Sequence, residues 1–188
     1  MVSKNYASKT AMWFLLITDA MTFSGFLIAY AVYRVMHAWP SPKEHLGIAL
    51  SSLATFILIC SSVSMVFSID ACKEKNKEGM LFWLLLTILG GFSFLGIQVY
   101  EYTHLIHNGM TFTTFAHGIP LFSTTFFLIT GFHGLHVLIG TIYLFILYIL
   151  AFQGTFDNGR YEALEVAGLF WHFVDLVWIL VFTFIYLL

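Results

Sequence analysis

Three ionisable residues lie in an apolar stretch near the C-terminus, and their spacing places them on one side of a helix. The stretch runs from Glu165 to Trp178 and also contains His172 and Asp175. At about 100° per residue, the three side chains fall within an arc of about 80°. Ionised groups are costly in hydrocarbon, so such side chains normally face other protein segments, cavities or polar partners. We therefore predict a polar strip on this helix, inside a small membrane bundle.

Another acidic residue in an apolar run is Asp19. It follows Lys9 by ten residues, which is about 15 Å along a helix. That depth is near the midplane of a hydrocarbon core about 30 Å thick. Two interpretations remain open. Asp19 is held by another helix with only a packing role, or it handles protons or contacts a partner.

Two histidines in the preceding apolar run, His133 and His136, are neighbours on one helix surface. Glycines in the same run allow another helix to approach closely. Counted from the expected cytoplasmic helix ends, His136 lies about 24 Å deep and Asp175 about 21 Å deep. A hydrogen bond between these two side chains is therefore feasible.

The histidines also raise the question of a haem or copper site. Two axial histidines can hold a haem between helices. Neighbours at i and i+3 cannot reach opposite faces of a flat ring, which leaves His133 with His172 as the only sensible pair. The sequence has no Cys-x-x-Cys-His or cysteine-rich metal pattern, and no Ser or Cys in a recognisable nucleophile context. We therefore interpret the histidines as structural, and expect no catalytic residue and no metal ligand in this chain.

A further polar strip lies at the end of the third apolar run. It consists of Gln98, Glu101 and His104, which are spaced at i, i+3 and i+6. We expect this strip near the outer membrane surface, with His104 at a solvated helix end. Glu101 completes a set of six residues that we call the polar spine. The polar spine consists of Glu101, His133, His136, Glu165, His172 and Asp175.

Composition indicates that lipid is the solvent of most of this chain. Of its 188 residues, 60% are hydrophobic and only 10% are charged, and the mean hydropathy is +0.88. A soluble domain of this length could not hide so much apolar surface. The net charge of −2 gives no indication of nucleic-acid binding. A disulfide between Cys60 and Cys72 is not expected, because one lies inside an apolar run and the other beyond its end.

The hydropathy pattern predicts an all-α fold with five membrane spans in one domain, residues 1–188. The spans are expected at 10–36, 46–70, 79–104, 118–152 and 161–188, each with the roughly 20 apolar residues that spanning requires. The first span is too long for a signal-peptide core. Six Lys and Arg residues flank one side and two flank the other, which predicts a cytoplasmic N-terminus and a C-terminus outside. The first group is Lys4, Lys9, Lys73, Lys75, Lys77 and Arg160; the second is Arg34 and Lys43.

Several of these stretches together resemble subunit III of the haem–copper oxidases. The resemblance is carried by Thr130–Gly140, with its Phe-His-Gly-Leu-His core, and by Phe170–Trp178, which reads Phe-Trp-His-Phe-Val-Asp-Leu-Val-Trp. The opening residues 13–34 and the segment Gln98–Tyr102 also resemble that family. The likeness covers nearly the whole chain and matches the short, five-span bacterial form.

The resemblance implies an all-helical accessory subunit without a redox centre of its own. In that family the chain packs against subunit I, where oxygen is reduced to water at a haem–copper pair and protons are pumped. Subunit II, which carries copper in cytochrome c oxidases, is a further expected partner. Members hold phospholipids, help to maintain proton uptake and protect the enzyme from inactivation during turnover. The resemblance thus implies a bacterial inner-membrane protein, with haem and copper in its partner subunits.

The resemblance also assigns roles to individual residues. Asp19 falls where the family commonly has a buried acid, often Glu, so it is the candidate for a proton-related role. The polar spine matches the family's structural and lipid-contacting positions. By charge, the candidates for lipid phosphate contact are Arg34, Lys73 and Arg160.

Alternatives within and outside this family remain open. Quinol oxidases and nitric oxide reductases carry related subunits, and other chains determine the electron donor. A free-standing membrane cytochrome b would use His133 and His172. A proton-coupled transporter would use Asp19 and Asp175, but the inverted repeat and broken helices typical of such proteins are not visible in the sequence.

Overall fold

The protein is built from long helices that run almost its whole length. The computed structural model describes residues 2–37, 39–40, 46–114, 119–156 and 161–188, with side chains from residue 8 onward. These residues contain no β-strand and form α1 (Val2–Met36), α3 (Ile48–Lys73), α4 (Lys77–His107), α5 (Pro120–Phe152), α6 (Glu162–Phe182) and the short π-helix η1 (Thr183–Leu187). Five helical stretches are long and apolar enough to cross a membrane, the last being α6 continued by η1. The predicted all-α class and its five spans are therefore confirmed.

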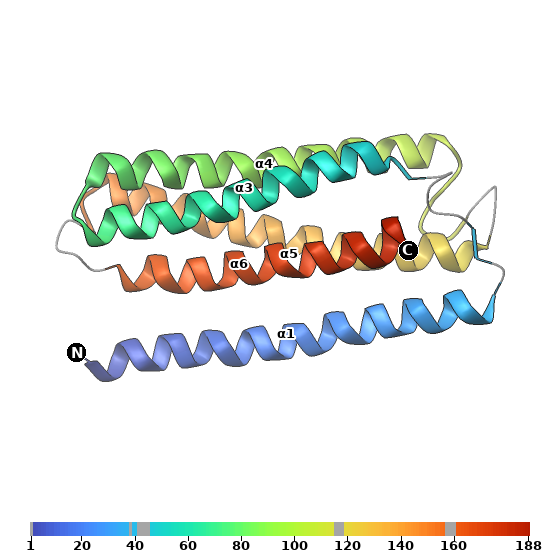
Figure 1. The fold of residues 1–188 in the computed structure, drawn as a ribbon, viewed down its shortest axis with the longest axis horizontal. Helices are drawn as coiled ribbons and strands as arrows, with labels where there is room; N and C mark the ends of the chain where they lie inside the picture. The colour runs from blue at the N-terminus through green and yellow to red at the C-terminus, as the bar shows by residue number, and fades with distance from the viewer. Residues whose placement is uncertain (1, 38, 41–45, 115–118, 157–160) are drawn as a thin grey trace.

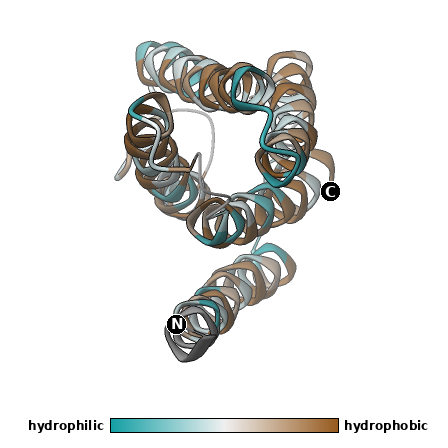
Figure 2. Ribbon diagram, turned by 90° about the vertical axis from the view of Figure 1, so that its left-hand side faces the viewer, coloured by the Kyte–Doolittle hydropathy of each residue, from teal (hydrophilic) through white to brown (hydrophobic). Residues whose placement is uncertain are grey.

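Four of the helices form a bundle, and the first lies beside it. Viewed end-on, α3, α4, α5 and α6 surround a common interior, while α1 lies outside this group (Figure 2). Helix α1 packs on α6 and, less extensively, on α5. The N-terminus, the α3–α4 turn and the start of α6 lie at one end of the bundle, and the C-terminus lies toward the other (Figure 1).

Turn chemistry explains where the helices begin and end. Asn76 caps α4 by accepting a hydrogen bond from the backbone N–H of Gly79 at 3.0 Å. Pro120 opens α5, where its missing N–H has no intrahelical partner to lose. Gly109 and Gly154 follow α4 and α5 with positive φ angles of 81° and 86°, which is the usual left-handed helix stop. Helix α4 extends beyond its apolar run at both ends, and α3 ends three residues beyond its own run, because hydropathy marks the membrane core and these signals mark the helix.

Close approach of three helices fixes the centre of the bundle. Gly91 of α4 faces α5 and α6, and a Cβ atom placed on it would lie 2.5 Å from Thr141 Oγ1 and 2.8 Å from Trp171 Cη2. Trp171 is only 1% exposed and donates its indole N–H to Ser61 Oγ at 3.2 Å. Small residues at such contacts let helix backbones pack closely, which is the main source of helix association in lipid.

Both cysteines are unpaired, as expected.

Candidate functional site

One carboxylate joins three helices at the end of the bundle that holds the N-terminus. Glu165 of α6 accepts from Lys9 of α1 at 2.5 Å and contacts Lys73 of α3 at 3.2 Å. Glu165 Oε2 meets the first ammonium group and Oε1 the second, so both oxygens are used. Lys73 also lies over the ring of Tyr161, 5.3 Å from its centroid. Lys73, a candidate for lipid phosphate contact, is thus already engaged within the chain, although its side chain remains 44% exposed.

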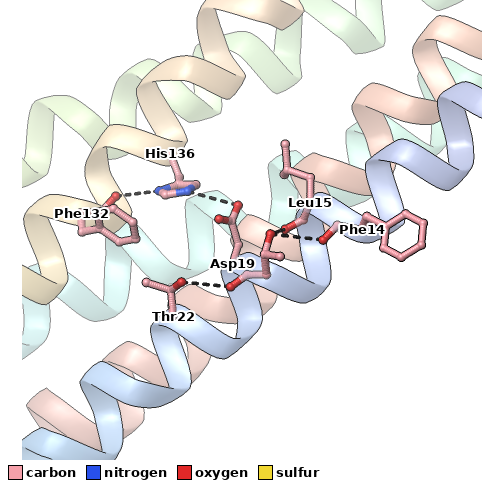
Figure 3. Close-up of polar contacts among 7 residues, drawn as sticks. Phe14, Leu15, Asp19, Thr22, Phe132 and His136 are labelled. Atoms are coloured by element: carbon pink, nitrogen blue, oxygen red, sulfur yellow. Dashed lines mark hydrogen bonds and ion pairs between the residues drawn. The ribbon is translucent and has the colours of Figure 1, made fainter.

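Near the middle of α1, Asp19 faces His136 of α5 (Figure 3). The carboxylate oxygen Oδ2 lies 3.4 Å from His136 Nε2, while Nδ1 of the same ring contacts the carbonyl oxygen of Phe132 at 2.8 Å. A carbonyl can only accept, so Nδ1 carries a hydrogen. Nε2 and the carboxyl group can then share one further proton, on either partner. The contact joins α1 to α5 near the middle of both helices.

The depths of His136 and Asp175 along their helices make a hydrogen bond between them feasible. In the structure, however, His136 contacts Asp19 instead. Asp175 lies on the side of α6 that faces α3, whereas His136 points toward α1. The reason is the position of α1, which packs on α5 and α6 and brings its own acid to the histidine. Depth along a helix says how far a residue lies from the helix end, but not which neighbour it faces.

On the side of α6 that faces α3, a serine connects two members of the polar spine. Ser62 of α3 contacts His172 Nδ1 through its hydroxyl at 2.6 Å. The same hydroxyl lies within reach of the Asp175 carboxyl group. Asp175 is 7% exposed, and its Oδ1 atom has no hydrogen-bond partner among the described residues. The sequence-based interpretation did not include Ser62.

His133 sits in an aromatic enclosure at the bundle centre. Its side chain is fully buried, and the rings of Trp178, Phe94 and Phe23 lie 4.9, 5.7 and 6.2 Å from it by centroid. Neither ring nitrogen has a hydrogen-bond partner among the described residues. Because the side chain is fully buried, neither ring nitrogen is open to a flat macrocycle in this arrangement. His172, the other member of the only sensible haem pair, contacts Ser62 through Nδ1.

Glu101 forms a second buried junction toward the opposite end of the bundle. It accepts from the hydroxyl of Ser51 at 3.0 Å and from that of Tyr186 at 2.9 Å. These contacts join α4 to α3 and to η1. Gln98, one turn earlier, donates to the carbonyl oxygen of Thr130 at 2.7 Å. Gln98 and Glu101 are buried between helices, whereas His104 is exposed.

Replacing Glu101 by leucine tests the importance of this junction. Tyr186 would lose its acceptor in a buried setting, which costs about 1–3 kcal/mol for an unsatisfied group, whereas Ser51 keeps the carbonyl oxygen of Gly47 at 3.1 Å. We expect a lower free energy of unfolding, measured in mixed SDS–detergent micelles. Glu101→Gln, which keeps a carbonyl acceptor, serves as the matched control and should lose less. Equal stability of the leucine variant and the parent would show that the junction does not stabilise the fold.

Helix α1 is therefore held to the bundle by polar contacts at three levels. Lys9 pairs with Glu165 near one end, Asp19 with His136 in the middle, and Arg34 donates to the backbone carbonyl oxygen of Leu188 at the other end. Arg34, a lipid-contact candidate, thus also has a partner within the chain. Arg160, the remaining lipid-contact candidate, lies outside the described residues.

The residues missed at the sequence level are mostly hydroxyl partners. Ser51, Ser62 and Tyr186 complete the contacts of Glu101 and His172, and none was singled out. A signal was available, because α3 carries buried serines along most of its length. Small hydroxyl residues in membrane helices commonly mark contact faces. Within the described residues, no three His, Cys, Asp or Glu side chains come together in a geometry suited to a metal ion.

Fold and contacts together define a class: a multi-pass helical membrane protein whose buried polar side chains contact one another between helices. The family model for cytochrome c oxidase subunit III matches residues 4–188. The chain is 37% identical over 176 residues to cytochrome c oxidase subunit 3 of Synechocystis, covering 92% of this chain and 72% of that one. It is 34% identical over 175 residues to the subunit 3 of Thermostichus vulcanus, covering 92% and 83%. This chain therefore belongs to the cytochrome c oxidase subunit III family.

Proposed function

We propose that this chain is a non-redox accessory subunit of a respiratory haem–copper terminal oxidase of the aa3 type. Its direct partner is subunit I, with subunit II and further subunits in the same complex, and haem and copper belong to those partners. Family membership over residues 4–188 supports the oxidase assignment. The observation that supports the non-redox role is the burial of His133, one of the two histidines that would have to hold a haem together. Its side chain is fully buried against the rings of Trp178 and Phe94.

The membrane orientation and lipid contacts form part of the same proposal. We place the chain in a bacterial inner membrane with its N-terminus in the cytoplasm. Lys9, Lys73 and the α3–α4 turn, with Lys75 and Lys77, gather at the end of the bundle that holds the N-terminus (Figure 1). Such a concentration of basic residues is typical of cytoplasmic flanks. Arg34, Lys73 and Arg160 remain the candidates for phospholipid headgroups by charge.

The direct test of the assignment is purification of a tagged copy of this chain from its native membrane. The proposal expects subunit I and subunit II to co-purify, together with haem and copper at the ratios of an intact oxidase. A tagged chain that folds in the membrane and is recovered without any haem-bearing partner would contradict the proposal.

Asp19→Asn tests whether the Asp19–His136 pair takes part in proton uptake or only in packing. Asparagine has nearly the same shape, so we expect assembly of the complex to persist. Because asparagine cannot bind or release a proton beside His136 Nε2, the substitution should slow proton uptake or shorten the active lifetime during turnover. The measurements are oxygen consumption and the rate of inactivation in the purified complex.

Asp19→Glu is the control for that experiment. It restores a carboxyl group, of the kind that the family commonly has at this position. It should therefore restore much of the proton uptake or active lifetime that is lost in Asp19→Asn. If Asp19→Asn leaves oxygen consumption and inactivation unchanged, Asp19 has a packing role only.

A further inference from the structure

A cavity opens between α1, α3 and α6 at the end of the bundle that holds the N-terminus. Its volume is about 360 Å³, and four charged side chains line it: Lys9, Asp70, Lys73 and Glu165. At about 30 Å³ per water molecule, it has room for about a dozen waters. Charged groups of both signs favour water over lipid chains, because exposing them to hydrocarbon costs several kcal/mol each.

The cavity continues inward along α6 to a histidine. His172, which is seven residues and therefore about 10 Å beyond Glu165, also lines the cavity. Its Nδ1 atom contacts the hydroxyl of Ser62 at 2.6 Å. The imidazole thus has one side on the cavity and the other on a hydroxyl group inside the bundle.

The next polar group inward is Asp175, one turn beyond His172. It is 7% exposed, and its Oδ1 atom is buried without a hydrogen-bond partner among the described residues. A buried carboxyl oxygen without a partner is costly, and buried water is the usual way in which proteins satisfy such atoms. An ordered water that bridges from the cavity past His172 would supply the missing donor.

We propose that the cavity is a water-filled inlet and that Asp175, with His172 and Ser62, forms a buried proton-binding site at its inner end. In the binding step, a hydronium ion in the inlet gives one proton to a carboxylate oxygen of Asp175. The products are a neutral carboxylic acid and one water molecule. Around the inlet, the titratable groups are Lys9 on α1, Asp70 and Lys73 on α3, and Glu165 and His172 on α6. The inlet and its site involve water and protons only, so they do not depend on which complex the chain joins.

Thiol labelling in the intact complex tests the inlet. Leu169 lines the cavity, and Leu176 lies seven residues further on nearly the same face of α6 and is 56% exposed. In a background with Cys60→Ser and Cys72→Ser, each leucine is replaced separately by cysteine. A charged methanethiosulfonate reagent, added from the aqueous phase, reacts with thiolates that water can reach.

The inlet predicts that the thiol at position 169 reacts at least about tenfold faster than the thiol at position 176, a difference of about 1.4 kcal/mol in barrier. Equally slow reaction at both positions would show that hydrocarbon fills the cavity and would overturn the inlet. Equally fast reaction at both would show that water wets the whole helix face, and this would also overturn it. Neither measurement uses oxygen reduction, so failure here leaves the proposed function untouched.

Infrared difference spectroscopy tests the proton-binding site separately. Acidification of the complex should produce a carboxylic acid C=O band that shifts in D₂O, because water reaches the site. The band should disappear in Asp175→Asn and persist in Asp19→Asn, which removes the carboxyl group that faces His136. A band that survives in Asp175→Asn, or the absence of any exchangeable band in the parent complex, would contradict the assignment of Asp175.

Discussion

Replacing Gly91 by leucine is expected to prevent most molecules of this chain from reaching the native bundle. Even a single Cβ atom at this position would lie 2.5 Å from Thr141 Oγ1 and 2.8 Å from Trp171 Cη2, distances that folded proteins do not tolerate. Overpacking by a few methylene groups costs about 1–3 kcal/mol in a well-packed core. Leucine adds four carbons where three helices meet, so we expect a loss at or above the upper end of that range.

The matched control for this variant is on the same helix. Gly96 of α4 is exposed, and a Cβ atom placed there would meet nothing within 4 Å. Gly96→Leu introduces the same side chain into the same helix and should leave the free energy of unfolding nearly unchanged. The comparison uses the fraction of monodisperse protein after extraction and unfolding in mixed SDS–detergent micelles. Equal yields of the two variants would mean that α4, α5 and α6 do not approach as closely as described.

Trp171→Ala is expected to lower the free energy of unfolding about as much as Gly91→Leu. It does so by removing a buried side chain, whereas Gly91→Leu adds one. The indole is 1% exposed and packs at the same junction as Gly91, where its N–H also donates to Ser61. Truncation of a buried tryptophan to alanine costs about 3–5 kcal/mol, because contacts are lost and the cavity collapses only partly. We expect the thermal and SDS-induced unfolding of the purified chain to shift strongly toward the unfolded state.

Leu176→Ala provides the comparison, since Leu176 lies on the same helix but is 56% exposed. A side chain that faces the surroundings loses few protein contacts on truncation, so this variant should unfold much like the parent. If both variants unfold at the same SDS fraction, packing at Trp171 is not what stabilises the bundle.

Much of the fold could be predicted from the sequence because the membrane makes the hydropathy signal strong. Each spanning helix must satisfy its backbone internally and present apolar side chains to lipid, so the five spans stand out. Their bounds were less predictable. The span expected at 79–104 became α4, Lys77–His107, because Asn76 and Gly109 rather than hydropathy define its ends.

The contacts of the polar residues were harder to predict than their positions. The arc shared by Glu165, His172 and Asp175 could be predicted, because the positions of side chains around a helix follow from helix geometry alone. The partner of His136 did not follow, since it depends on the rotation and neighbours of α1. A sequence gives the depth of a residue in a helix, but the direction it faces is set by packing against helices far away in the chain.

The partners of Glu101 illustrate a second limit of prediction from the sequence. Ser51 lies fifty residues earlier and Tyr186 eighty-five residues later, and both carry hydroxyl groups that are common in membrane helices. Their spacing carries no pattern that links them to Glu101. Such contacts arise only when the ends of α3, α4 and η1 meet.

The central claim is that this chain supports a redox enzyme and holds no electron carrier itself. The most direct measurement is the visible absorption spectrum and metal content of the chain, compared between the purified complex and the chain separated from it in detergent. Haem and copper should remain with the partner subunits, and the separated, still helical chain should show neither a Soret band nor bound copper. A Soret band at one haem per chain that is lost in His133→Ala or His172→Ala would contradict the claim.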